Sequence, residues 1–353
     1  MKITAAGLGL AGSLVCSCAL AQSAVPQSSV TLYGLVDTGV VAAWGGNAKR
    51  SFGEDHYHTS RFGLLGNEDL GGGLSAIFKL ESRFLPRTGQ QQDSATFFND
   101  EAYVGLRSKT FGTLRLGRIY SPFYLAVAGR IDPFNGDGIG SMTGFTSIGH
   151  NLSPGNLYDT AKGFPNLDVR TSNAVDYTSP TLYGLTLDYQ TSLPGAGISK
   201  QQSVALKYDS DHFLAETGYE RQAYQKHAFD WHVGGGVIFG PVKVTAGYTQ
   251  GYFDDDEYAR GNKTRTEFLG VTYHVTPSQA ILAAVANMHS DEATLIDAAK
   301  GTGSSAVKFA IGYEYSLSKR TLVYVHYAHV TKPLAFIFVS NTNKAMIGID
   351  HKF

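Results

Sequence analysis

Two histidines lie one residue apart in the segment E54-DHYH, a spacing that could serve metal binding. On an extended chain, His56 and His58 place both imidazoles on the same side. A metal site normally uses three or four protein ligands, and no third ligand is evident beside this pair. The sequence therefore predicts no metal site here and favours an external loop.

Nucleophilic catalysis is also disfavoured. A hydrolase needs a nucleophile and a histidine base that are presented together, whereas His56 and His58 lie in the predicted loop. The acidic run D254-DDE257 could hold divalent cations, but a run of acids is usually a solvated loop. We therefore expect neither an enzyme nor a cofactor.

Charged and apolar residues alternate in the segment L74-SAIFKLESRF. One face carries Leu74, Ala76, Phe78, Leu80 and Phe84, and the other carries Ser75, Lys79, Glu81 and Arg83. This period of two residues is typical of a β-strand with one face in water. The charged face is expected to meet water, and the apolar face lipid or a neighbouring subunit.

The same alternation recurs along the chain, with Gly, Pro, Asn or Asp between the segments, and it predicts an all-β protein of about sixteen strands. The predicted strands are 30–44, 59–66, 74–84, 97–108, 113–119, 169–178, 185–192, 203–209, 213–222, 228–239, 242–253, 263–275, 280–289, 306–316, 321–330 and 344–353. The chain is 43% hydrophobic and 17% charged. After residue 21 it contains no apolar run of about 18 residues, the length of a membrane-spanning helix.

The N-terminus has the pattern of a secretory signal. Lys2 is followed by a small and apolar stretch, and Ala19-Leu20-Ala21 forms a cleavage site before Gln22. We expect residues 1–21 to be removed and residues 22–353 to form a single barrel domain. Both cysteines, Cys16 and Cys18, leave with the signal; the alternative is a lipidated Cys18, because V15-CSC loosely resembles a lipobox.

Loss of Lys2 from the 29 basic residues leaves 28 against 30 acidic ones. A nearly neutral chain gives no electrostatic case for binding nucleic acid.

Short and long connections alternate between the predicted strands. Gly240-Pro241 and Ser210-Asp211-His212 are short, whereas the stretches 45–58 and 254–262 are long. This rhythm is typical of a sixteen-stranded antiparallel transmembrane β-barrel with short turns at one rim. In such a barrel the strand that ends at Phe353 pairs with the strand that begins near Val30 and closes the sheet. A soluble periplasmic β-protein remains the alternative, because alternation alone does not say which face is inside.

Six segments spread over the mature chain resemble the trimeric porins of Gram-negative outer membranes, and more closely their β-proteobacterial branch. They are S29-VTLYGLVDTGV, S60-RFGLLGNEDLGGGLSAIFKLE, A102-YVGLRSKTFGTLRLGR, N173-AVDYTSP, L317-SKRT and H351-KF. The resemblance implies a homotrimer in the cell outer membrane that passes small hydrophilic solutes by diffusion. It also implies that the barrel-assembly machinery recognises the C-terminal strand through Phe353.

The stretch 120–168 is predicted to be functional, because a connection this long is uncommon inside a compact domain. In the family, the third external loop folds into the lumen and narrows it. The segment I131-DPFNGDG loosely resembles part of that loop. Asp137 matches its acidic end, and Asp132 can supply the carboxylate that Phe134 replaces. The alternative is a solvated surface loop.

The resemblance also implies a ladder of arginines on the opposite wall. Arg61 and Arg170 match two of its positions, but Asp100-Glu101 stands where a third basic residue is usual. This departure puts anion preference in doubt. Lys79, Arg83 and Arg118 can restore positive charge, with Glu81 opposing them. Family similarity turns Asp100 toward the lumen, whereas alternation with Ala102 and Val104 turns Glu101 inward instead.

The predicted function is that of a water-filled outer-membrane channel for passive diffusion. Opposed acidic and basic rows across a narrow gap orient water and polar solutes and exclude apolar ones. Each charged residue could equally be a wall ion pair without a role in transport. The main alternative is a substrate-specific channel for a small anionic or sugar-like solute. Expected partners are two further copies of the chain, outer-membrane lipids and lipopolysaccharide.

Overall fold

The computed structural model describes residues 28–46, 50–142, 169–193, 201–222, 229–255, 259–290, 304–331 and 342–353. The predicted signal, with Cys16, Cys18 and the cleavage site before Gln22, lies outside the described residues. So do residues 143–168 of the predicted functional loop and the side chains of the acidic run 254–257.

The chain is almost entirely β-structure, as the alternating segments predict. Its elements are β1 (Ser29–Trp44), β2 (Ser51–Asp55), β3 (Arg61–Gly71), β4 (Leu74–Leu85), β5 (Gln90–Gln91), β6 (Ala102–Ser108), β7 (Gly112–Tyr120), α1 (Pro122–Ala126), η1 (Val127–Ile131), β8 (Arg170–Thr178), β9 (Leu185–Ser192), β10 (Gln201–Asp209), β11 (Phe213–Gln222), β12 (Phe229–Phe239), β13 (Val242–Asp255), β14 (Ala259–Thr276), β15 (Gln279–Ser290), β16 (Ser304–Ser316), β17 (Thr321–Val330) and β18 (Asn343–Lys352). No helix in the described part of the chain is long and apolar enough to cross a membrane.

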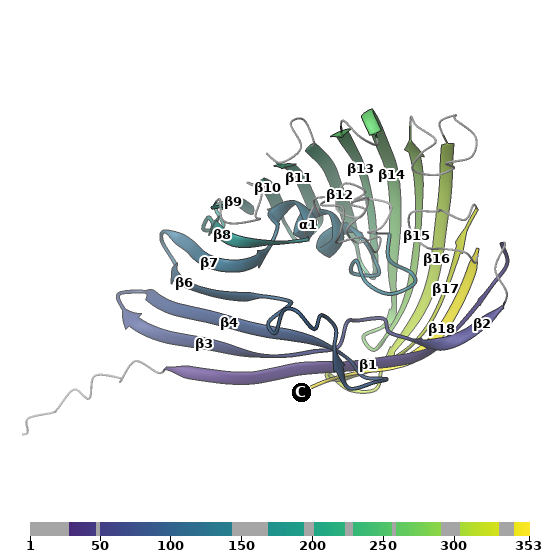
Figure 1. Cartoon of the computed structure of the whole chain (residues 1–353), viewed down its shortest axis with the longest axis horizontal. Coiled ribbons are helices and arrows are strands. Elements are labelled where there is room, and N and C mark those ends of the chain that lie inside the picture. The colour runs from purple at the N-terminus through teal and green to yellow at the C-terminus, as the bar shows by residue number, and fades with distance from the viewer. Residues whose placement is uncertain are drawn as a thin grey trace, which may run out of the picture.

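One antiparallel sheet curves into a closed ring (Figure 1). Sixteen of the described strands form the barrel, each paired with its sequence neighbours. The ring closes where β18 pairs with β1, in a register that runs from Leu35 opposite Lys352 to Trp44 opposite Asn343. The predicted closure is therefore confirmed. The two remaining strands are additions at the rim: β2 pairs with the second half of β1, and β5 pairs with the end of β4.

Several predicted bounds differ from the observed ones; the stretch 254–262, expected to be a loop, is shortened because β13 ends at Asp255 and β14 begins at Ala259. The strand predicted to begin at Phe97 begins at Ala102, and β3 continues to Gly71, so that its turn is shorter than expected. Gly71, Gly72 and Gly73 all adopt positive φ, a conformation that glycine reaches without steric cost. The stretch 45–58 was expected to be a loop, but part of it forms β2.

The barrel carries its apolar residues outside and its polar residues inside. On β1, the side chain of Val40 is 60% exposed, whereas Asp37 is fully buried. β18 repeats this arrangement, with Ile347 and Ile349 exposed and Asp350 buried. A soluble sandwich has the opposite arrangement, so the soluble alternative is wrong.

After β7 the chain enters α1 and η1 and continues to residue 142; we call residues 121–142 the inner segment. Ser121 caps α1 by accepting a hydrogen bond from the Tyr124 amide, and Pro122 occupies the first turn. In Figure 1, α1 lies within the ring of strands. Strand glycines make room for the inner segment, because a Cβ atom would lie within 3.1 Å of one of its side chains at Gly218, Gly247, Gly270 and Gly312.

Candidate functional site

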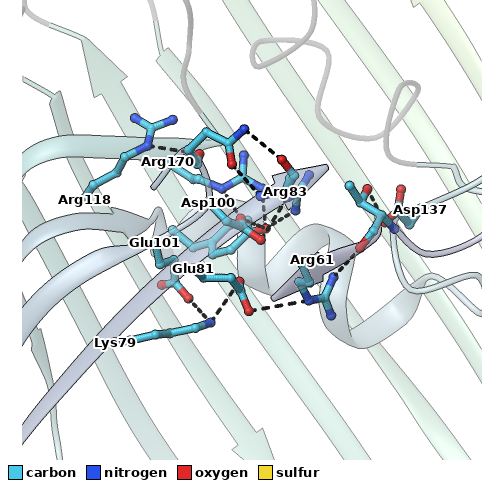
Figure 2. A network of polar contacts seen from close by, with 12 residues as sticks. Arg61, Lys79, Glu81, Arg83, Asp100, Glu101, Arg118, Asp137 and Arg170 are labelled. Atoms are coloured by element: carbon cyan, nitrogen blue, oxygen red, sulfur yellow. Dashed lines mark hydrogen bonds and ion pairs between the residues drawn. The ribbon is translucent and has the colours of Figure 1, made fainter. Parts of the chain in front are cut away.

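Two clusters of opposite charges gather where β3, β4, β7 and β8 face the inside of the ring (Figure 2). The strand period places Lys79, Glu81 and Arg83 of β4 on the inner face, as predicted from their spacing. Arg61 of β3 lies directly opposite Arg83 in the register of the two strands. Neighbouring arginines repel each other unless acids lie between them.

The first cluster is built around Asp100, whose side chain is 1% exposed. Its two oxygens lie 2.9 Å from Arg83 Nε and 2.5 Å from Arg170 Nε. The Tyr120 hydroxyl donates to the same carboxylate at 2.8 Å, and the Arg170 guanidinium lies over the Tyr120 ring at 4.3 Å. Burial alone would raise the pKa of Asp100, but the neighbouring Arg83 and Arg170 charges lower it well below its usual range.

The second cluster is built around Lys79. Its Nζ lies 2.6 Å from Glu101 Oε2 and 3.2 Å from Glu81 Oε1. Glu81 also lies 3.6 Å from Arg61 Nε and accepts a hydrogen bond from the Tyr33 hydroxyl at 2.5 Å. Each basic group in this cluster therefore has an acidic neighbour.

Asp100 and Glu101 both point into the ring, although adjacent residues of a regular strand point to opposite faces. The backbone explains this result. Glu81 donates its amide to the Glu101 carbonyl and accepts from the Asp100 amide, so two residues oppose one, as in a β-bulge. Regular alternation begins only at Ala102, where β6 starts. The expectation that one of the two acids faces outward is thus wrong.

The remaining predicted residues lie in different surroundings. Arg118 of β7 adjoins the first cluster and donates to the Asn99 carbonyl and the Ser172 hydroxyl. Asp137 accepts from the amide and hydroxyl of Thr59 at 2.9 and 3.0 Å, which ties the inner segment to the start of β3.

Asp132 does not join the charged clusters. Its side chain lies inside the inner segment, where it accepts from the amides of Phe134 at 3.0 Å and Met142 at 2.7 Å. Burial raises the pKa of Asp132, and these two donors act in the opposite direction. The Asp132 carboxylate therefore stabilises the fold of the loop. This differs from the prediction, which placed Asp132 beside Asp137 as an acid that lines the pore.

The inner segment is fastened to the far wall of the ring by polar contacts. Arg130 pairs with Glu216 of β11 at 2.6 Å and with Asp209 of β10 at 2.8 Å. The Thr245 hydroxyl donates to the Ile131 carbonyl at 2.6 Å, and the Lys308 ammonium donates to the Ser141 carbonyl. These contacts span from β10 to β16, so the segment crosses the interior between opposite walls.

An opening of about 420 Å³ lies between the clusters and the inner segment. Its lining includes Arg61, Lys79, Glu81, Arg83, Asp100 and Asp137. The nine charged residues labelled in Figure 2 comprise five basic and four acidic ones. The arrangement sets opposite charges across a polar space.

Three contributors were not predicted from the sequence. Tyr33, Tyr120 and Arg130 were not singled out, yet each holds a charged partner. Tyr120 shares the inward parity of Arg118, which was a signal available in the sequence. Arg130 gave no such signal, because its position depends on how the inner segment folds.

The predicted histidine pair does not come together. His56 faces Asp55 at 3.6 Å, whereas His58 Nδ1 lies 2.7 Å from Asp350 of β18. Asp37, His58 and Asp350 form the single group of three potential metal ligands found among the described residues.

Comparison with known proteins gives consistent matches over nearly the whole chain. The family described as Gram-negative porin matches residues 5–332. An outer membrane porin protein of Bordetella pertussis is 27% identical, over 94% of this chain and 96% of that protein. Outer membrane porin protein 32 of Delftia acidovorans is 29% identical, over 96% and 92% of the two chains.

Solved structures share the fold at lower identity. The anion-selective porin from Comamonas acidovorans superposes with a TM-score of 0.75 at 24% identity, covering 93% of this chain and all of that one. OmpF of Salmonella typhi gives a TM-score of 0.69 at 15% identity, covering 92% and 97%. The trimer form of OmpT from Vibrio cholerae gives 0.68 at 14%, covering 92% and 99%.

Proposed function

Since the chain belongs to the family of Gram-negative porins and forms an outer-membrane channel for passive diffusion, we propose that the charged clusters and the inner segment form the constriction of this channel. Small hydrophilic solutes and ions would pass between them without a binding step or a chemical step. Supporting this proposal, the clusters and the inner segment line the same opening, and Arg130 and Asp137 anchor the segment on opposite sides. Paired charges across a gap orient water and favour polar solutes.

The selectivity that we propose is weak. Asp100 bridges Arg83 and Arg170, and Glu101 neutralises Lys79. The Comamonas protein is named an anion-selective porin. In this chain Asp100 and Glu101 lie among the basic residues, so the positive charge that a passing anion meets is partly neutralised. The Asp100 bridge is the observation that carries this proposal.

Reversal potentials under a KCl gradient test it. Asp100→Asn and Glu101→Gln each remove one negative charge, and Asp100→Arg changes the local charge by two units. At about 8 Å in water each unit is worth about 0.5 kcal/mol to a passing ion, with opposite sign for anions and cations, so the anion-to-cation permeability ratio should move about fivefold per unit toward anions before screening. The shift should fade at high salt because ions screen the field.

The control is Asp211→Asn, in the exposed turn between β10 and β11, which should leave the reversal potential unchanged. Unaltered selectivity in Asp100→Asn and in Glu101→Gln would mean that the clusters do not line the ion path.

The assembly that we propose is a homotrimer in contact with outer-membrane lipids and lipopolysaccharide. It rests on family membership, and the trimer form of the Vibrio OmpT, which shares the barrel fold, supports it. We further propose that the barrel-assembly machinery recognises β18 and Phe353, and that the chain is no enzyme. Gel migration before and after heating would reveal a trimer, and a monomer under both conditions would contradict it.

A further inference from the structure

We propose that Asp37, His58 and Asp350 form a binding site for a divalent transition-metal cation of the Zn²⁺ class. The site lies where the barrel closes, because Asp37 of β1 is directly opposite Asp350 of β18. His58 comes from the short connection between β2 and β3. The three residues are therefore brought together only by the closed fold.

The distances fit a small cation with nitrogen and oxygen ligands. The three potential ligand atoms lie within 4.8 Å of one another. His58 Nδ1 is 2.7 Å from Asp350 Oδ2 and 3.8 Å from Asp37 Oδ2. Tetrahedral zinc with bonds of about 2.0–2.1 Å separates its ligand atoms by about 3.3 Å. Small side-chain movements would bring all three atoms to that separation.

The two carboxylates of Asp37 and Asp350 give this group a negative charge that favours binding of a cation. Both carboxylates are fully buried, and like charges directly opposite each other destabilise a pair of strands. Among the residues that the structure describes, His58 is the one basic side chain within ion-pair distance of either acid. A divalent ion would compensate both carboxylates at once.

Asp350 provides an independent sign of a missing ligand. Its side chain is 1% exposed, and its Oδ1 atom has no hydrogen-bond partner among the described residues. A buried acceptor without a partner is costly, and such atoms in a native fold require an explanation. Coordination of a cation would satisfy this oxygen.

Asp37 is held in place by other donors. The Tyr324 hydroxyl donates to its Oδ1 at 2.6 Å, and the amides of Tyr57 and His58 donate at 3.2 and 2.9 Å. Hydrogen bonds of this kind orient ligands and strengthen metal sites. The arrangement also explains why His56 takes no part, since its ring faces Asp55 instead.

A cation could reach the site from the aqueous interior. His58 lines the opening of about 420 Å³, and it lines a second opening of about 240 Å³ together with Asp350. One imidazole with two carboxylates suits zinc, whereas calcium and magnesium prefer six or more oxygen ligands. The expected occupant is therefore Zn²⁺ or a similar ion, and a solvent molecule would complete its coordination.

Calorimetric titration with zinc chloride tests the site on untagged, folded, chelator-treated protein in detergent. The wild-type chain should bind Zn²⁺ saturably, and calcium should not compete. His58→Gln and Asp350→Asn should each weaken the affinity at least about tenfold. His56→Gln is the matched control and should bind as the wild type does. Cobalt should give the absorption spectrum of a tetrahedral site in the wild type and lose it in His58→Gln.

Two results would overturn the proposal: no saturable zinc binding by the wild type, or equal zinc binding by the wild type, His58→Gln and Asp350→Asn. His58 lies outside the strands, so its variant carries the test even if Asp350→Asn fails to fold. Conductance measured in zinc-free buffer reports separately on the channel, so failure of the metal site leaves the proposed function intact.

Discussion

Asp100 is an acid held among cations, and this changes how it responds to pH. Because Arg83 and Arg170 lower its pKa below the usual range, the folded protein keeps Asp100 ionised at pH values where an ordinary carboxyl group gains a proton. Its folded pKa lies below the unfolded value of about 3.9. The stabilisation from this bridge is then complete above about pH 3.9 and is lost as the pH falls toward the folded pKa.

We expect Asp100→Asn to lower the free energy of unfolding by about 3 kcal/mol at neutral pH, because two largely buried guanidinium groups lose their shared acid. The deficit relative to the wild type should stay constant from about pH 7 to about pH 5 and should shrink below about pH 4. Denaturant titration followed by heat-modifiable gel migration measures it. Asp211→Asn is the control, and a deficit that grows in acid would contradict the assignment.

At the residue level, the sequence identified most of the charged side chains but not their partners. Lys79, Glu81 and Arg83 follow directly from strand alternation, which depends only on local geometry. The shared inward direction of Asp100 and Glu101 does not follow, because a bulge depends on how two strands meet. Asp132 was misplaced for a similar reason, since its partners come from the folding of the inner segment on itself.

Among the elements, the inner segment depends on side-chain anchors rather than on strand pairing. Arg130 anchors it on the far wall through two acids, Glu216 and Asp209. Charge-assisted hydrogen bonds of this kind contribute about 1.5–3 kcal/mol. An element held by few such contacts opens locally more readily than the barrel wall does.

We therefore expect Arg130→Ala to raise single-channel conductance and to increase current noise, with little change in barrel stability. Planar-bilayer recording measures both quantities. Arg87→Ala, at an exposed arginine in the turn after β4, is the matched control. Conductance and noise equal to those of the wild type would show that the anchor does not position the segment.

The closing strand pair depends on a glycine. Phe353 and Gly34 exchange backbone hydrogen bonds at 3.0 and 3.2 Å. A Cβ atom at Gly34 would lie 2.3 Å from the Phe353 ring and 2.7 Å from the Arg61 carbonyl oxygen. Only glycine leaves room for both neighbours.

Gly34→Ala should therefore displace the Phe353 ring and reduce the amount of barrel inserted into the outer membrane, while the inserted fraction keeps its conductance. Membrane fractionation with gel quantification measures the yield. Gly53→Ala is the control, because the nearest atom to its Cβ would be 3.9 Å away. Equal yields from the two variants would contradict the role of the glycine.

For the whole molecule, diffusion through a constriction without a binding step implies that the rate of solute flux does not saturate as the solute concentration rises. Swelling of liposomes that contain the protein should increase in proportion to the concentration of neutral sugars and fall with their size. Saturation by one sugar, or block of the ion current by one anion, would instead indicate the substrate-specific alternative.

The architecture as a whole was predictable because its determinants repeat. Sixteen alternating segments, short turns at one rim and the pairing of the first and last strands all follow from a period of two and the need to leave no open edge. The course of the inner segment was not predictable, because it depends on contacts between residues far apart in the sequence. The metal-ligand group at the closure was missed for the same reason, since its three members come from three separate segments.

Closure of the ring through β1 and β18 also has a kinetic consequence. The side-chain amide of Asn343 donates a hydrogen bond to the carbonyl of Trp44, 299 positions earlier in the chain. The other strand pairs of the barrel join strands that are neighbours in the sequence. Loop-closure entropy costs about 0.6 kcal/mol for each doubling of length, so this contact forms late. Until this contact forms, one edge of β1 has unpaired backbone N–H and C=O groups, which can pair with strands from other chains. A nascent chain of this kind therefore needs a chaperone that covers the edge of β1 until β18 pairs with it.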